Sequence, residues 1–161
     1  SAYVEKETID SLKANAVPLS WGDARELEKH GISFGPHTIS HVILSKCSDE
    51  HAHEQIQGSW NMLTQQLEQP CPIFAYPTGR KEDFSGRDIK YIKQIGLLGA
   101  VTAEPGCVNF NDITEADNYL IKRMSFPSSI EDLIQYSSGL ELIKQNVRDF
   151  KLKLKYTTKK N

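Results

Sequence analysis

The chain has 161 residues, of which 39% are hydrophobic and 25% charged, and its formal net charge is −2. This length predicts one domain, and these fractions are ordinary for a globular protein. A nearly balanced charge gives no reason to expect a nucleic-acid partner. No apolar run approaches the roughly 18 residues that a membrane-spanning helix requires, so the sequence predicts no transmembrane segment.

The two ends of the chain and its cysteines add few constraints. Residues 1–7 lack the apolar stretch of a signal peptide, and the first residue is Ser1 rather than methionine. We therefore expect a processed chain or a piece of a longer one, and the compartment stays open between the cytoplasm and a bacterial envelope. The widely spaced Cys47, Cys71 and Cys107 predict buried, reduced thiols rather than a disulfide framework or a cysteine-only zinc site.

Amphipathic stretches alternate with short apolar runs along the chain. Helices are expected at about 21–30, 49–68 and 85–95 and again from residue 130, and strands at 32–34, 73–76, 98–102 and 119–124. Ser20, Ser48 and Ser129 are placed to cap three of the helices. This alternation predicts parallel strands joined by helices, in an open sheet or a barrel. In both architectures, chemistry is carried by loops at the carboxyl ends of the strands.

Two histidines follow the first expected strand. His37 and His41 stand four residues apart after Gly35-Pro36, and on a helical turn this spacing would put both rings on one face, within reach of one metal ion. The spacing alone is a weak indication, because most such pairs are solvated. Thr38 occupies the position of the glutamate in H-E-x-x-H, which argues against a metalloprotease of that type. A catalytic zinc site would need a third ligand, for which a carboxylate is the natural candidate.

The second candidate motif follows the strand at 73–76. In Pro77-Thr78-Gly79-Arg80, the N–H of Thr78 or Gly79 is a candidate to stabilise an oxyanion, and an ordinary turn is the alternative interpretation. We interpret Asp83 as a solvated loop residue. His51 and His53, two apart on a helix, are interpreted as solvated, and Trp60 and Tyr91 as core residues.

The order of these motifs resembles the polysaccharide deacetylases, that is, carbohydrate esterase family four with its NodB-homology domain. The resemblance covers roughly residues 19–124. Residues 31–41 resemble the strand that leads into the family's H-[ST]-x-x-H metal motif, and residues 74–79 resemble its third motif. Residues 100–106 resemble the strand and loop that follow. The motifs in this order are far more specific than any one of them.

The resemblance implies an α/β fold of the distorted (β/α) barrel type and a divalent metal, usually zinc. It implies hydrolysis of acetyl groups from an N-acetylated polysaccharide or oligosaccharide. Carried over to this chain, His37 and His41 bind the metal and the backbone N–H of Thr78 is the oxyanion donor. The substrate contacts are expected from the rest of that loop, at Tyr76, Pro77, Gly79 and Arg80.

The chain also departs from the family pattern. The aspartate pair that supplies the base and the third metal ligand is not found, and no histidine follows His53 to act as the late general acid. Ala75 stands where an arginine commonly orients the base, with Arg80 as a candidate substitute. We therefore expect residues 1–150 to form a partial deacetylase-like domain that lacks its first strands, followed by a basic tail at 151–161.

Three further expectations follow from the missing motif. The chain alone should have little deacetylase activity. The alternatives to a deacetylase are a non-catalytic carbohydrate-binding or scaffold relative of the deacetylases, or an unrelated α/β domain whose histidine pair is incidental. The missing strands would leave an unpaired sheet edge, which favours a homo-oligomer.

Overall fold

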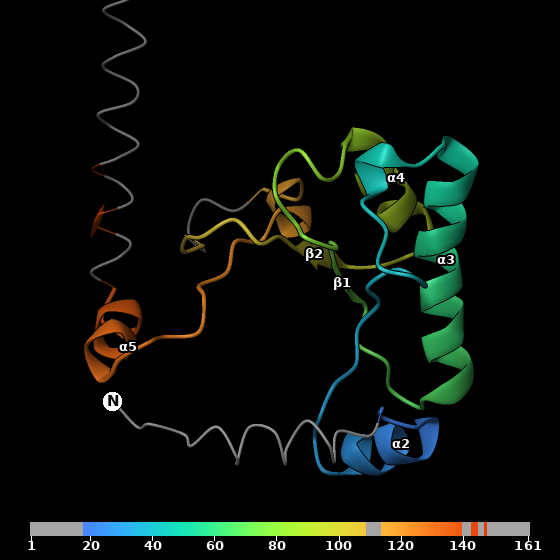
Figure 1. Ribbon diagram of the computed structural model, residues 1–161, viewed down its shortest axis with the longest axis horizontal. Coiled ribbons are helices and arrows are strands. Elements are labelled where there is room, and N and C mark those ends of the chain that lie inside the picture. Colours follow the sequence, from blue (N-terminus) through green and yellow to red (C-terminus); the bar gives the residue numbers. More distant parts are fainter. Residues whose placement is uncertain (1–17, 109–113, 140–142, 145–146, 148–161) are drawn as a thin grey trace, which may run out of the picture.

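The computed structural model describes residues 18–108, 114–139, 143–144 and 147 (Figure 1). Its elements follow one another as α2 (Trp21–Lys29), the 3₁₀ helix η1 (Leu44–Lys46), α3 (Asp49–Gln66), β1 (Ile73–Ala75), α4 (Gly86–Gln94), β2 (Gly99–Val101), the 3₁₀ helix η2 (Asp117–Tyr119) and α5 (Ile130–Ser137). The four expected helices are confirmed, each within about two residues of its expected start.

The serine caps explain where three helices begin. The side chains of Ser20, Ser48 and Ser129 accept the backbone N–H three residues ahead, at the first turn of α2, α3 and α5. Each cap satisfies one of the N–H groups that a helix leaves unpaired at its start, so all three caps are confirmed.

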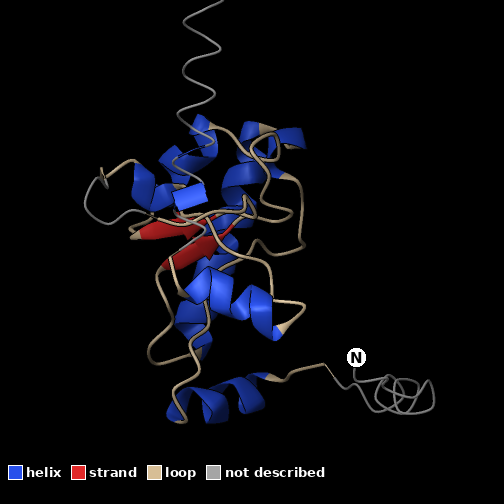
Figure 2. Cartoon of the chain, turned by 90° about the vertical axis from the view of Figure 1, so that its left-hand side faces the viewer, coloured by secondary structure: helices blue, strands red, loops and turns tan. Residues whose placement is uncertain are grey.

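The described sheet has two parallel strands, and α4 makes the crossover between them. The two strands lie side by side in Figure 2. Ile73 lies opposite Gly99 and Ala75 opposite Val101. Parallel strands joined by a helix are the arrangement that the alternating pattern predicted. The fold is thus mixed α/β, whereas two described strands do not establish a closed barrel. The homo-oligomer through a sheet edge stays a prediction.

Two expected strands are wrong. Residues 32–34 run beside β1, where Phe34 O accepts the N–H of Cys71 and Pro36 O accepts that of Ala75, but Pro36 has no N–H to donate in return. The segment 119–124 keeps one bridge, between Val101 and Ile121. Tyr119, at the start of the expected strand, belongs to η2 instead. The turn before η2 is closed by the carboxylate of Asp117, which accepts the N–H of Thr114 at 2.9 Å.

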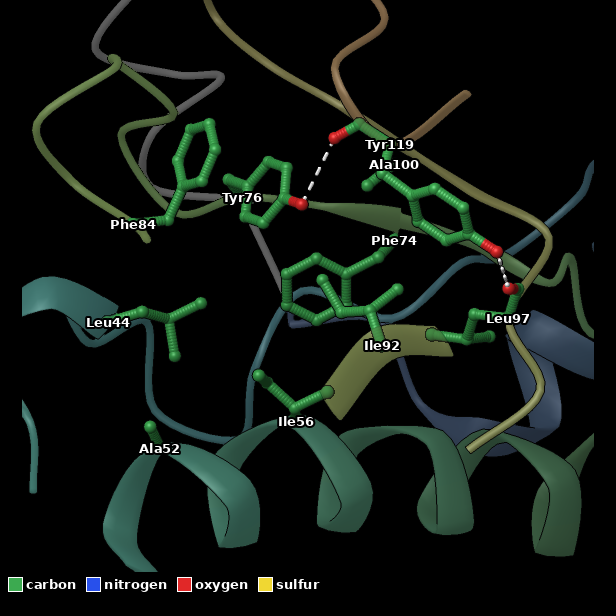
Figure 3. Packing of buried hydrophobic residues seen from close by; sticks show 10 residues of the cluster. All are labelled: Leu44, Ala52, Ile56, Phe74, Tyr76, Phe84, Ile92, Leu97, Ala100 and Tyr119. Carbon is green, nitrogen blue, oxygen red and sulfur yellow. Dashed lines mark hydrogen bonds between the residues drawn. The ribbon is translucent and has the colours of Figure 1, made fainter. Parts of the chain in front are cut away.

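The core fills the space between the sheet and α3 (Figure 3). Ile56 of α3, Phe74 of β1 and Ile92 of α4 are completely buried. Two tyrosines also lie there with their hydroxyls satisfied: Tyr76 donates to Tyr119 O at 3.1 Å, and Tyr119 donates to Leu97 O at 2.9 Å. Trp60 and Tyr91 pack against this cluster partly buried, as predicted. The core fixes α3 against β1, which matters for the site below.

Helix α5 differs from the others because its apolar residues are not covered. It lies apart from the sheet in Figure 1, and Ile130, Leu133 and Ile134 remain 62%, 47% and 57% exposed. Among the described residues no helix is both long and apolar enough to span a bilayer. Cys47, Cys71 and Cys107 form no disulfide and are half-buried. The tail at 151–161 lies outside the described residues.

Candidate functional site

His37 and His41 lie side by side, but not on a helix. Their ring centroids are 4.8 Å apart in an edge-to-face arrangement. The chain brings them together through two residues in the left-handed region, Thr38 with φ 65° and His41 with φ 56°. The helical turn assumed from the i, i+4 spacing is therefore wrong, and a tight irregular loop produces the same proximity.

The ring of His37 is oriented by β1. Its Nδ1 lies 2.7 Å from the carbonyl oxygen of Ala75, the last residue of the strand. A carbonyl can only accept, so the hydrogen-bond pattern assigns the proton to Nδ1 and leaves the lone pair on Nε2. A histidine held in this way by a carbonyl is the usual arrangement of a metal ligand. Both histidines are exposed, so their rings are accessible.

A buried glutamine holds the loop between the two histidines. Gln55 of α3 is 5% exposed, and its Oε1 accepts the N–H of Ile39 at 3.1 Å, the N–H of Ser40 at 3.0 Å and the hydroxyl of Ser40 at 3.2 Å. The sequence alone did not single out Gln55 as a residue of the site. The available signal was a polar side chain on the apolar face of α3, beside Ile56.

In the loop after β1, the two candidate oxyanion donors, the N–H groups of Thr78 and Gly79, differ in their hydrogen bonding. Thr78 has φ 55° and Gly79 has φ 70°. The N–H of Gly79 donates to Pro77 O at 2.6 Å, whereas within the described part of the chain the N–H of Thr78 has no hydrogen-bond partner. Of the two donors considered from sequence, the one at Thr78 is thus available.

This second loop is fixed by its neighbours. Gly79 O accepts the N–H of Ala103 at 2.8 Å, and a Cβ at Gly79 would lie only 2.7 Å from that nitrogen. The carboxylate of Asp83 accepts the N–H of Arg80 at 2.9 Å. The Thr78 hydroxyl and then the Arg80 N–H hold the pKa of Asp83 below its ordinary value. Asp83 therefore organises the loop, which the sequence interpretation as a solvated residue did not foresee.

Backbone strain is concentrated in these two loops. Over the described residues, the non-glycine residues with positive φ are Thr38, His41 and Thr78. Left-handed backbone costs a non-glycine residue about 1–2 kcal/mol, and such strain gathers at functional sites. The hydrogen bond between His37 and Ala75 brings both loops to the carboxyl end of β1, which is where the alternating sequence pattern predicted the chemistry.

Two of the four expected substrate contacts, Tyr76 and Pro77, have buried side chains. Tyr76 is 1% exposed and stacks on Phe84 with ring centroids 3.8 Å apart. Burial, with a smaller contribution from the Asp88 carboxylate, raises the pKa of Tyr76. Pro77 and Gly79 are buried as well, and Arg80 is exposed. Substrate contacts at Tyr76, Pro77, Gly79 and Arg80 stay a prediction; the side chain of Arg80 is accessible, whereas those of Tyr76 and Pro77 lie in the interior.

A metal site at His37 and His41 would need further ligands from nearby residues. Within the described ranges no group of three His, Cys, Asp or Glu residues could hold a metal ion. Asp88 is a fully buried acid, but it caps the start of α4. Its carboxylate accepts the N–H of Ser85 and forms an ion pair with Arg87. The histidine pair, with an Nε2 lone pair assigned for His37, fits two ligands of a zinc-like ion and needs completion by other groups.

Two hollows border these loops. One of about 200 Å³ is lined by His37, Thr38 and the apolar side chains of Trp21, Ile39 and Met62. The other, of about 380 Å³, adjoins the Thr78–Gly79 turn through Ala103 and is otherwise lined by residues 123–126. The first hollow thus lies directly beside the loop that carries the histidines.

Comparison with known protein sequences gives a family match. The sequence model of the polysaccharide deacetylases matches residues 2–99. YxkH of Bacillus subtilis (strain 168), which carries the name of a polysaccharide deacetylase, is 28% identical over 85 residues, or 53% of this chain and 29% of YxkH. The chain thus spans less than a third of that relative.

Solved structures show the same relationship. The deacetylase PplD of Streptococcus pyogenes, solved in complex with acetate, matches 76% of this chain and 52% of its own with a TM-score of 0.64 and 25% identity. A polysaccharide deacetylase from Bacillus cereus matches 73% of this chain and 36% of its own, with a TM-score of 0.63 and 22% identity, and shares the fold. Since the family's sequence model covers more than half of the residues, the chain belongs to the polysaccharide deacetylase family.

Proposed function

We propose that this chain carries the metal-binding histidines and the oxyanion loop of a deacetylase that removes acetyl groups from an N-acetylated polysaccharide. One observation carries the proposal: the tether from His37 Nδ1 to Ala75 O, which brings an exposed histidine pair to the strand end that Thr78 follows. Membership of the family supports it. In this proposal, residues 1–150 form part of a distorted (β/α) barrel.

Each loop has a distinct role. His37 and His41 hold a divalent metal, zinc in this proposal, through ring nitrogens. A bound zinc supplies Lewis-acid polarisation of the acetyl carbonyl and lowers the pKa of a water. The free N–H of Thr78 donates to the acetyl carbonyl oxygen, where negative charge develops. Arg80, exposed beside this turn, contacts the polysaccharide.

Zinc titration of the full chain tests the metal claim. We expect one zinc per chain, and affinity reduced more than about 100-fold in His37→Ala or His41→Ala, since losing even an outer-shell partner costs about 10–100-fold. His51→Ala is the matched control, because His51 is half-exposed on α3 and its side chain pairs, among the described residues, with Glu54 alone. Binding that is not stoichiometric, or that survives His37→Ala, would sink the proposal.

A second measurement addresses the reaction. We expect the chain alone to release little acetate from an N-acetylglucosamine oligomer with zinc present, because the described residues offer no carboxylate to complete the metal site. Rapid acetate release would show that a base is supplied by residues of this chain.

One observation favours the alternative of a non-catalytic carbohydrate-binding relative. The described residues contain two of the ligands of a metal site and no third. That relative would bind the oligomer equally well with zinc or with a chelator, and its affinity would be unchanged in His37→Ala. The deacetylase proposal requires instead that zinc binding depends on both histidines.

A further inference from the structure

The loop that carries the histidine pair has a geometry that its own sequence does not favour. Thr38 is β-branched and left-handed, and three residues later His41 is left-handed as well. For Thr38 alone this conformation costs about 1–2 kcal/mol. Conformations of this kind persist only when the surrounding structure determines them. Something outside the loop must therefore hold it.

Gln55 is placed to do this. Three donors converge on its Oε1, and all three belong to Ile39 and Ser40, between the two strained residues. The convergence of donors assigns the amide oxygen, rather than the nitrogen, to this side of the carboxamide. One side-chain atom thus satisfies two backbone N–H groups that the irregular loop would otherwise leave unpaired.

The glutamine itself is rigidly held. It lies in the first half of the 18-residue helix α3, where the next residue, Ile56, is completely buried against β1 and α4. On the other side, the His37 ring is held by Ala75 at the end of β1. The packing of α3 on β1 therefore fixes the two ends of the arrangement, because one anchor belongs to each element.

We propose that Gln55 is a positioning residue for the metal-binding pair: its carboxamide sets the separation of the His37 and His41 rings for a divalent cation. This inference rests on the proposed function, because it concerns the same site. Gln55 touches no metal or substrate in this proposal. It acts only through the loop, so its substitution changes metal affinity while the core remains folded.

The test uses four variants of the full chain, each titrated with zinc after its folding is confirmed by circular dichroism. Gln55→Leu removes the acceptor at similar volume, and we expect its zinc affinity to fall about 10–100-fold. Gln55→Asn withdraws the amide by one methylene and should lose affinity too. Gln55→Glu keeps an acceptor at the same reach and should stay within a few-fold. Gln57→Leu is the control, since the Gln57 side chain on the same helix donates, within the described part of the chain, to Asn61 alone.

A second readout needs no metal. In the metal-free wild type we expect slow amide hydrogen exchange at Ile39 and Ser40 and a ring-to-ring nuclear Overhauser effect between His37 and His41. Both should be lost in Gln55→Leu and Gln55→Asn and kept in Gln57→Leu.

The outcomes separate this inference from the proposed function. If the wild type binds no zinc, the proposed function fails, and the exchange and ring contacts still decide the role of Gln55. If a folded Gln55→Leu or Gln55→Asn keeps the ring contact, the slow exchange and the wild-type affinity, the positioning role is overturned. Should Gln55→Leu fail to fold, Gln55→Asn and Gln55→Glu provide the same comparison.

Discussion

The two loops at the carboxyl end of β1 are strained in the same way but held by different groups. The first, residues 37–41, is held by side-chain bonds, from Gln55 to its backbone and from His37 to Ala75. The second, residues 77–80, is held mainly through its backbone, by the contact of Gly79 with Ala103 and by the bond from Arg80 N–H to Asp83.

The difference determines which groups each loop can offer to a ligand. In the first loop the N–H groups of Ile39 and Ser40 are occupied, so what it presents is side chains, the two imidazoles. In the second loop the side chain of Tyr76 is buried, so what it presents is a backbone donor at Thr78. A site that needs both metal ligands and an oxyanion donor can thus be assembled from two short loops.

The largest effect is expected from breaking the backbone contact of the second loop. Gly79→Ala should reduce the free energy of unfolding by more than about 2 kcal/mol, because it adds a left-handed penalty of about 1–2 kcal/mol and a clash with Ala103 N. Gly96→Ala is the matched control, since Gly96 has φ 85° and open space around its Cβ position. Urea denaturation measures both, and equal losses would show that the contact with Ala103 is unimportant.

A smaller effect of opposite sign is expected in the first loop. Thr38→Gly should raise the free energy of unfolding by about 0.5–1 kcal/mol: it relieves about 1–2 kcal/mol of left-handed strain and adds about 0.5–1 kcal/mol of chain entropy. It also deletes the Thr38 hydroxyl, a buried oxygen without a partner in the described part of the chain. Zinc affinity should fall, because the loop becomes more flexible.

Thr64→Gly is the control for this variant, because Thr64 is an exposed residue of α3 and its replacement should destabilise the helix. If Thr38→Gly destabilises the protein as Thr64→Gly does, the strain at Thr38 is not released by glycine. Tight zinc binding in Thr38→Gly would instead mean that loop rigidity does not matter to the metal.

These two loops also mark how far the sequence could predict the structure. The helix starts followed from local chemistry, since a serine and the N–H three residues on decide a cap without help from distant residues. The parallel pairing of β1 and β2 followed from the alternation of elements. The proximity of His37 and His41 was expected, but from a helical turn that does not exist.

What the sequence did not predict depends on contacts between distant residues. Gln55 is 15 residues from Ser40, and nothing near either residue indicates the bond. The burial of Tyr76 depends on Phe84 and on Tyr119, which is 43 residues away. The expected strand at 32–34 does not form because Pro36 has no N–H to donate to β1. The sequence shows the proline, but it does not show which strand lies beside it. Local signals therefore predicted the elements, and tertiary contacts decided the site.

The smallest expected effect concerns the acid side of the pH profile. Asp83 has a lowered pKa in the folded protein, through the Thr78 hydroxyl and the Arg80 N–H, so it stabilises the fold above the unfolded pKa of about 3.9. That contribution is lost as the pH falls through the folded pKa. Asp83→Asn should thus be slightly less stable than the wild type at pH 6 and equal to it near pH 2.

Asp23 provides the comparison, because its pKa is lowered in the same direction by Ser20 at the start of α2, far from either loop in the sequence. Asp23→Asn should change the same pH window but leave the amide chemical shift of Arg80 unchanged, whereas Asp83→Asn should abolish the acid titration of that shift. If the Arg80 amide still titrates in Asp83→Asn, another carboxylate holds the second loop. The second loop would then be held by Ala103 and by that carboxylate rather than by Asp83.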